Sequence, residues 1–208
     1  MIVNKRAAER LNIDYEFIKF ENDDNIDPRA MKIKIINNVL KNTKYKIIIF
    51  IDSDAWIHDV INLNNIINYF IDSNKHGSYS RDPPPFDPEK EVNISFNINH
   101  NNTYINSGVF MLIVNDFTKN MYHYLENELI EHPRKFGPFD QSYISKFVYK
   151  NKNDFLIFES NVLNSPKGKV IRHNWWKNNV MHEDLDYLIK NDIDINYNEN
   201  FDFKMYIQ

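Results

Sequence analysis

Apolar residues follow two periods along this chain, and these periods predict its helices and strands. Helical spacing predicts helices over residues 3–11, 27–40, 64–70, 116–130, 140–149 and 183–190. Short apolar or alternating runs predict strands over residues 15–20, 45–51, 78–80, 104–114, 155–158 and 170–171. Asp27 and Pro28 are typical of a helix start, because Asp accepts first-turn amides and Pro has no amide to lose. The alternation of helices and strands predicts an α/β fold.

The run from Tyr45 to Ile51 is apolar at nearly every position and predicts a central strand, buried on both faces of a largely parallel sheet. The triplet Asp52-Ser53-Asp54 follows directly. Ligands of open parallel sheets bind at the carboxyl ends of the strands, so these two carboxylates can converge on a divalent cation. The alternative is that the acidic pair only ends the strand and caps the next segment. The triplet alone leaves both interpretations open.

The composition narrows the class of protein. With 208 residues, of which 42% are hydrophobic and 14% aromatic, the chain has enough apolar surface for one folded domain. Its 25 basic and 29 acidic residues give a net charge of -4, which argues against a nucleic acid or an anionic membrane as the partner. The absence of cysteine excludes disulfides, thiolate metal sites and cysteine nucleophiles.

Six short motifs stand in a fixed order along most of the chain. They are Lys5-Arg6-Ala7-Ala8-Glu9-Arg10, Asp27-Pro28-Arg29-Ala30-Met31-Lys32, Ile48-Ile49-Phe50-Ile51-Asp52-Ser53-Asp54-Ala55, Ile105-Asn106-Ser107-Gly108-Val109-Phe110, Phe139-Asp140-Gln141-Ser142 and Ile171-Arg172-His173. With these motifs the chain resembles the GT-A-fold retaining glycosyltransferases of the galactosyl-, mannosyl- and xylosyltransferase type, which include yeast Golgi α-galactosyl/α-mannosyltransferases and plant xyloglucan xylosyltransferases. The resemblance covers roughly residues 4–177. It implies one GT-A-type α/β domain over residues 1–190, with a mixed, mostly parallel sheet flanked by helices, and a tail or edge segment over residues 191–208.

The resemblance also implies a reaction and a metal. The enzyme would transfer a sugar from a nucleotide sugar, with a UDP-sugar favoured, to a hydroxyl of a glycan or glycoconjugate with retention of configuration. Asp54 would bind Mn²⁺ or Mg²⁺, Asp52 would contact the ribose and the metal shell, and His173 would complete the metal site. The alternative for His173 is a partly buried histidine packed beside Trp175 and Trp176.

Other matched residues would surround the donor and the reacting sugar. The resemblance places Ser53, Arg81, Asp82, Asn106, Ser107, Gly108 and Lys177 around the donor, and Asp140 and Gln141 in the catalytic site. Asp140 and Gln141 would hold the sugar and stabilise an oxocarbenium-like centre, and Asp140 is the carboxylate we expect in a covalent intermediate if one forms. Ordinary alternatives are helix capping for Asp140, a turn for residues 106–108 and an exposed loop ion pair for Arg81 and Asp82.

The chain departs from the family at its start, where members have a first strand that helps to hold the nucleotide base. This departure implies either a truncated start or a reduced nucleotide pocket. Two other functions stay open: a non-catalytic relative that binds glycans or nucleotides, and a phosphohydrolase of the haloacid-dehalogenase type with Asp52 as nucleophile. Ala55 and Trp56 argue against the phosphohydrolase, which normally has Thr or Val there.

The given sequence shows no pattern typical of a targeting signal or a membrane-spanning segment. Its longest apolar run, residues 47–51, is far shorter than the roughly 20 residues that span a bilayer, and the charged N-terminus has no signal-peptide pattern. We therefore expect a soluble cytoplasmic enzyme of viral or microbial origin, or a lumenal catalytic domain excised from an anchored protein. The pattern favours no particular oligomeric state.

Overall fold

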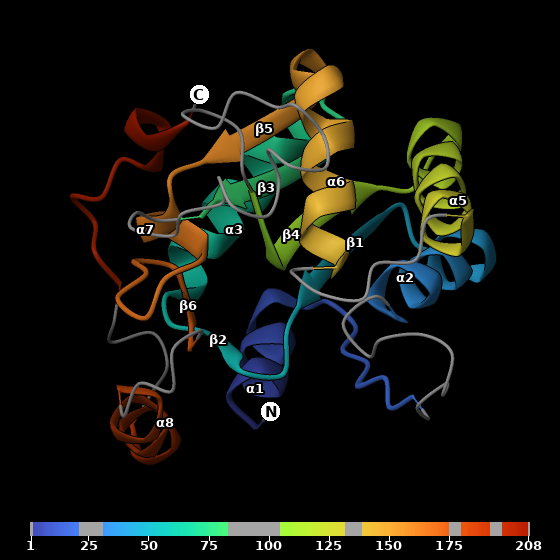
Figure 1. The fold of residues 1–208 in the computed structure, drawn as a ribbon. Helices are drawn as coiled ribbons and strands as arrows, with labels where there is room; N and C mark the ends of the chain where they lie inside the picture. The colour runs from blue at the N-terminus through green and yellow to red at the C-terminus, as the bar shows by residue number, and fades with distance from the viewer. Residues whose placement is uncertain are drawn as a thin grey trace.

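A computed structural model describes residues 2–20, 31–82, 105–131, 139–174, 180–191 and 197–207, and shows helices packed around a twisted sheet (Figure 1). The helices are α1 (Ile2–Leu11), α2 (Met31–Asn42), α3 (Val60–Asp72), α5 (Asp116–Glu131), α6 (Phe139–Lys150), α7 (Ser160–Leu163) and α8 (Val180–Lys190). The strands are β1 (Ile47–Ile51), β2 (Ala55–Ile57), β3 (Gly77–Arg81), β4 (Ile105–Ile113), β5 (Phe155–Phe158) and β6 (Ile171–His173). Within the described ranges, short 3₁₀ helices cover Lys152–Asp154 and Phe203–Tyr206.

The main sheet has four strands in the order β1-β4-β3-β5. Strand β4 pairs antiparallel with β1 and with β3, and β3 pairs parallel with β5. The predicted class, an α/β fold with a mixed sheet flanked by helices, is therefore confirmed, although antiparallel pairs prevail in the described part of the sheet. The expectation that residues 45–51 form a central strand is wrong for the described strands: β1 lies at the edge and all its residues are half-buried. An apolar run shows that a strand is covered, but it does not show how many neighbours the strand has.

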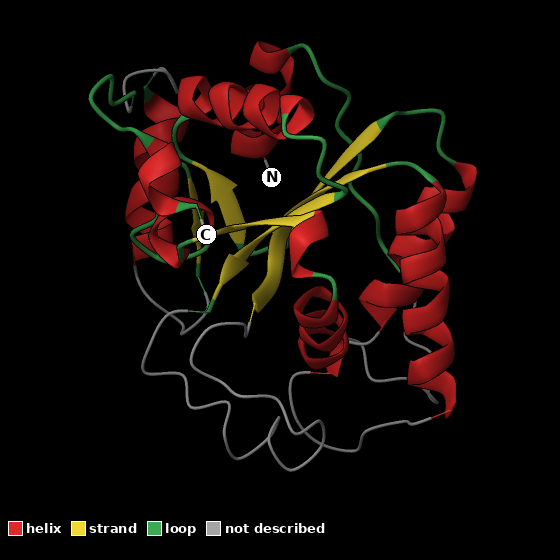
Figure 2. Cartoon of the chain, turned by 90° about the horizontal axis from the view of Figure 1, so that it is seen from above, coloured by secondary structure: helices red, strands yellow, loops and turns green. Residues whose placement is uncertain are grey.

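Helices cover both faces of the sheet (Figure 2). Alternate residues of β4 point to opposite faces, so Val109 and Met111 join one hydrophobic core whereas Phe110 and Leu112 join the other. The first core contains residues of α1, α3, α7 and α8, and the second contains residues of α2, α5 and α6. The sheet is thus the middle layer of the fold.

A second sheet of two short strands, β2 and β6, carries part of the candidate site. Its register pairs Ala55 with His173 and Ile57 with Ile171. The buried side chain of Asn4 in α1 supports β2, because its Nδ2 donates to the Ala55 carbonyl at 2.9 Å and its Oδ1 accepts from the Ile57 amide at 2.9 Å. A polar side chain on the first helix therefore replaces a strand neighbour for β2.

Most predicted elements are present, and some boundaries differ. Helix α3 is longer than predicted and α8 begins three residues earlier. Strand β2 and helix α7 were not predicted, because three and four residues are too short for a periodic signal. The strand expected over residues 15–20 is absent: these described residues are irregular and exposed, including Phe17 at 43% and Phe20 at 45%.

The described part of the C-terminal segment, residues 197–207, packs against the fold. Phe203 is buried, and Ile207 forms an isolated antiparallel bridge with Phe158 at the end of β5. Among the described residues, no helix combines the length and the apolar character that crossing a bilayer requires. The helix start at Asp27-Pro28 and the tryptophans Trp175 and Trp176 lie outside the described residues.

Candidate functional site

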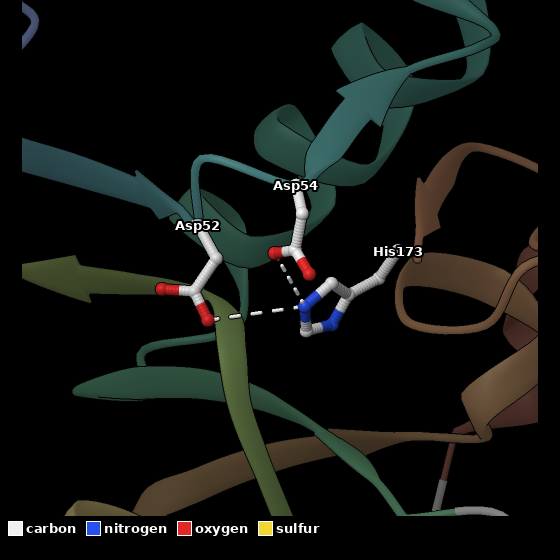
Figure 3. A group of neighbouring side chains, drawn as sticks. All are labelled: Asp52, Asp54 and His173. Carbon is white, nitrogen blue, oxygen red and sulfur yellow. Dashed lines mark hydrogen bonds and ion pairs between the residues drawn. The ribbon is translucent and has the colours of Figure 1, made fainter. Parts of the chain in front are cut away.

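Asp52, Asp54 and His173 converge from two sheets (Figure 3). Asp52 follows β1 and Asp54 precedes β2, and a turn between them is closed by the Ala55 amide donating to the Asp52 carbonyl at 3.0 Å. The β2–β6 register brings His173 beside this turn, with its Nε2 at 3.1 Å from Asp54 Oδ1 and 3.8 Å from Asp52 Oδ2. The three ligand atoms all lie within 4.8 Å of one another, which is close enough to bind one metal ion.

The His173 ring is fixed by its surroundings. Its Nδ1 donates to Asn164 Oδ1 at 2.7 Å, and its Nε2 faces the two aspartates, where it donates to Asp54 when it carries a proton and offers a lone pair to a metal ion when it does not. The ring also lies over Gly108 of β4. A Cβ at position 108 would be 2.1 Å from His173 Cε1 and 2.6 Å from Nδ1, so only glycine leaves room for the ring.

Two carboxylates and one neutral imidazole form a ligand set that suits a divalent cation with a preference for oxygen and nitrogen. The hydrogen bond from His173 holds the pKa of the Asp54 carboxyl below its usual value, against the opposing effect of burial. Burial raises the pKa of the Asp52 carboxyl, although the charges of Lys32 and His173 act in the opposite direction. The residues present therefore fit a metal site.

Lys32 of α2 is a site residue that the sequence analysis did not assign. The side chain is half-buried, and its Nζ lies 3.0 Å from Asp52 Oδ1 and 3.1 Å from Asp140 Oδ2. Nζ also donates to the Ser107 carbonyl oxygen at 3.1 Å. Burial alone would lower the Lys32 pKa, but the charges of Asp140 and Asp52 prevail and raise it. Lys32 is therefore a charged bridge between two carboxylates. Its position in the sequence could have indicated this role, because α2 is amphipathic and a charged residue on the inner side of such a helix needs a partner of opposite charge.

Asp140 and Gln141 lie in the first turn of helix α6, next to β4. The Ser107 hydroxyl donates to Asp140 Oδ2 at 2.5 Å, and the Ser107 amide donates to Gln141 Oε1 at 3.4 Å. The Asp140 side chain is also bound by Lys32, and the residue is buried. These contacts join α6, β4 and α2 around one polar cluster.

Asp82 follows β3 and lies in the same cluster. Its Oδ1 accepts from Asn106 Nδ2 at 2.8 Å and its Oδ2 accepts from Gln141 Nε2 at 2.5 Å. Asn106 Oδ1 in turn accepts from the Gly108 amide at 2.7 Å. Burial raises the pKa of Asp82 to about 6, despite the two hydrogen bonds that stabilise its charge. Asp82 therefore titrates closer to neutrality than an ordinary aspartate.

Two further predicted donor residues, Ser53 and Arg81, lie among the described residues, and a third does not. Ser53 lies exposed in the turn between the two aspartates. Arg81 Nη1 donates to Glu159 Oε1 at 3.1 Å, at the end of β3. Lys177 lies outside the described residues. The structure thus brings together nine predicted residues with Lys32, namely Asp52, Asp54, Asp82, Asn106, Ser107, Gly108, Asp140, Gln141 and His173. Asp54 joins the others through His173, which lies 3.8 Å from Asp52.

The fold matches that of a solved glycosyltransferase. A structure described as "crystal structure of a glycosyltransferase involved in the glycosylation of the major capsid of PBCV-1" aligns with a TM-score of 0.61 at 14% identity, covering 89% of this chain and 90% of that chain. No known family profile matches the sequence. No curated protein is significantly similar to it. At this identity the likeness establishes a shared fold.

Gly108→Ala should remove the space that His173 occupies. We expect the variant to bind Mn²⁺ at least tenfold more weakly, because the ring must move from the aspartates, and titration of free Mn²⁺ by electron paramagnetic resonance measures this. Gly77→Ala is a matched control, because its Cβ would press on Phe155 and Leu112 in the core instead. Wild-type Mn²⁺ affinity in Gly108→Ala would show that His173 is not positioned as described.

Lys32→Met should raise the affinity for Mn²⁺ in the absence of nucleotide. The substitution removes the cation that Asp52 now contacts, so we expect binding about tenfold tighter, equivalent to about 1.4 kcal/mol. Lys32→Arg keeps the charge and should bind Mn²⁺ as the wild type does. Weaker binding in a folded Lys32→Met protein would contradict competition between the lysine and the metal.

Asp82 should titrate with a midpoint near pH 6, above the usual 3.8. Carbon-13 NMR of the side-chain carboxyl measures this, and Asp82→Asn identifies the signal. Since the folded state holds this proton more tightly than the unfolded chain, the stabilising contribution is fully present below about pH 4 and is lost as the pH rises through about 6. A midpoint near 4 would mean that water reaches the carboxyl freely.

Proposed function

We propose that this protein is a metal-dependent glycosyltransferase that moves a sugar from a nucleotide sugar, with a UDP-sugar favoured, to a hydroxyl of a glycan or glycoconjugate with retention of configuration. The observation that carries the proposal is the cluster of Asp52, Asp54 and His173, placed in a fold that a known glycosyltransferase shares. The resemblance of the six motifs to retaining glycosyltransferases supports the same reaction.

The metal ligands would hold Mn²⁺, or Mg²⁺ in its place, which when bound supplies positive charge for the diphosphate of the leaving nucleotide. Asp54 and His173 approach each other directly, and Asp52 lies between them and Lys32. Lys32 is the other positive charge beside the donor position. A cation on each side of Asp52 suits a donor that carries two phosphate groups.

Asp140 and Gln141 would act on the sugar. Lys32 and the Ser107 hydroxyl both bind Asp140 Oδ2 and fix the position of this carboxyl group, which would stabilise an oxocarbenium-like centre. Gln141 accepts from the Ser107 amide and donates to Asp82, and it would hold these groups in place to bind hydroxyls of the sugar. In a front-face reaction the acceptor hydroxyl attacks from the side on which the leaving group departs, so no protein nucleophile is needed; if a covalent intermediate forms, Asp140 is the proposed nucleophile.

The test is release of nucleoside diphosphate from a panel of UDP- and GDP-sugars in the presence of Mn²⁺ and acceptor glycans. We expect release from one donor, complete inhibition by EDTA, and a loss of at least 100-fold in Asp54→Asn, because the leaving diphosphate then lacks its ion. Asp186→Asn, an exposed aspartate on α8, is the matched control and should keep wild-type activity. Asp54→Asn should melt as the wild type does, since the turn itself is unchanged.

Two outcomes would contradict the proposal. Metal-dependent binding of UDP or GDP without release from any donor would identify a non-catalytic nucleotide-binding relative. Release that persists in EDTA or in Asp54→Asn would show that the three residues do not hold a catalytic metal. Products in which the transferred sugar has the opposite anomeric configuration would overturn retention alone.

A further inference from the structure

A cavity of about 490 Å³ lies between helix α3 and the C-terminal segment of residues 197–204. Among the described residues that line it, none belongs to the candidate site. We propose that this cavity binds a neutral oligosaccharide. This oligosaccharide would be part of the acceptor glycan. That assignment rests on the proposed function, whereas saccharide binding at the cavity does not.

Hydrogen bonds of two buried side chains, Asp59 and Asn62, hold the two walls of the cavity together. Asp59 is 1% exposed and caps α3, where it accepts from the Asn62 amide at 2.9 Å and from Asn62 Nδ2 at 2.7 Å. Asp59 also accepts from the Asn198 amide at 3.3 Å, and Asn62 Nδ2 donates to the Asn198 carbonyl at 3.1 Å. The C-terminal segment is therefore fastened to the start of α3, and a site between rigid walls costs a ligand less entropy.

Aromatic rings supply apolar surfaces in the cavity. Tyr69 packs edge-on against Phe203, with ring centroids 5.6 Å apart, and Lys204 Nζ lies 5.5 Å from the Tyr69 centroid. Phe201 packs against Tyr206 at 5.5 Å, so its orientation is also fixed. Tyr197 lines the same cavity and is 40% exposed. Aromatic rings pack well against the apolar C–H faces of sugar rings, and an entirely polar cavity would offer these faces no apolar contact.

Amide side chains supply hydrogen bonds beside these rings. Asn65 and Asn68 are exposed on one face of α3, three residues apart, and Asn200 faces them from the C-terminal segment. Each amide offers two donors and an acceptor oxygen, as the hydroxyls of a sugar require. A cavity of about 490 Å³ falls within the range of about 300–1,000 Å³ of small-molecule sites.

The charges of the lining residues select a neutral ligand. The carboxylates Asp72, Glu199 and Asp202 outnumber the single cation, Lys204. A phosphate, a nucleic acid or an anionic lipid would be repelled by this excess. An apolar ligand would leave the amides and carboxylates without partners. A neutral saccharide fits both the apolar rings and the polar groups.

The test is a titration of the protein with xylotetraose, cellotetraose and α-1,6-mannotriose, in which NMR measures the backbone amide chemical shifts at each step. We expect one of these probes to shift signals of residues 65–69 and 197–202. The double variant Asn65→Ala/Asn68→Ala and the single variant Tyr197→Ala should each bind it at least tenfold more weakly. Their matched controls, Asn120→Ala on α5 and Tyr187→Ala on α8, are exposed and should bind as the wild type does.

The outcomes separate this proposal from the proposed function. Asp54→Asn should keep saccharide binding at the cavity, and binding without any glycosyl transfer would contradict the proposed function alone. Transfer activity with no shift at the cavity for any of the three probes would overturn the cavity proposal alone. Shifts there with Ca²⁺ and none with saccharide would also overturn it, because the three carboxylates would then be a cation site.

Discussion

The pairing of β2 with β6 is the contact on which the candidate site depends. It places residues 54 and 173, which are far apart in the sequence, beside each other, since Ala55 pairs with His173 and the Asn174 amide donates to the Asp54 carbonyl at 3.0 Å. A slip of one residue would turn the His173 side chain to the opposite face of the pair. Asn4 of α1 and the glycine at position 108 then hold the strand and the ring in this register.

Electrostatics explains why this cluster suits a divalent cation. Asp52 and Asp140 both contact the ammonium group of Lys32, and Asp54 is a third carboxylate beside them, so these three carboxylates have a formal excess of two negative charges over Lys32. Burying unpaired charge is costly, and a bound divalent cation would remove the excess. The neutral imidazole of His173 adds a ligand without adding charge. Lys32 therefore stabilises two of these carboxylates by itself, and the remaining negative charge favours a divalent cation.

The sequence predicted most of the fold and most of the candidate site, for identifiable reasons. Long elements such as β4 and α5 have clear periods and were predicted within one or two residues. The edge position of β1 and the irregular segment 15–20 were not predicted, because strand neighbours depend on tertiary contacts. Asp54 and His173 were found by motif order, whereas Lys32 was missed because a lysine on a helix ordinarily points to solvent.

A crystal structure with Mn²⁺ and UDP, recorded near the manganese absorption edge, would test the central claim most directly. Our account predicts one anomalous peak within metal-ligand distance, about 2.0–2.6 Å, of Asp54 and His173 Nε2, with Asp52 in its coordination shell and the diphosphate on its open side. A peak elsewhere, or Mn²⁺ bound without His173, would contradict the account.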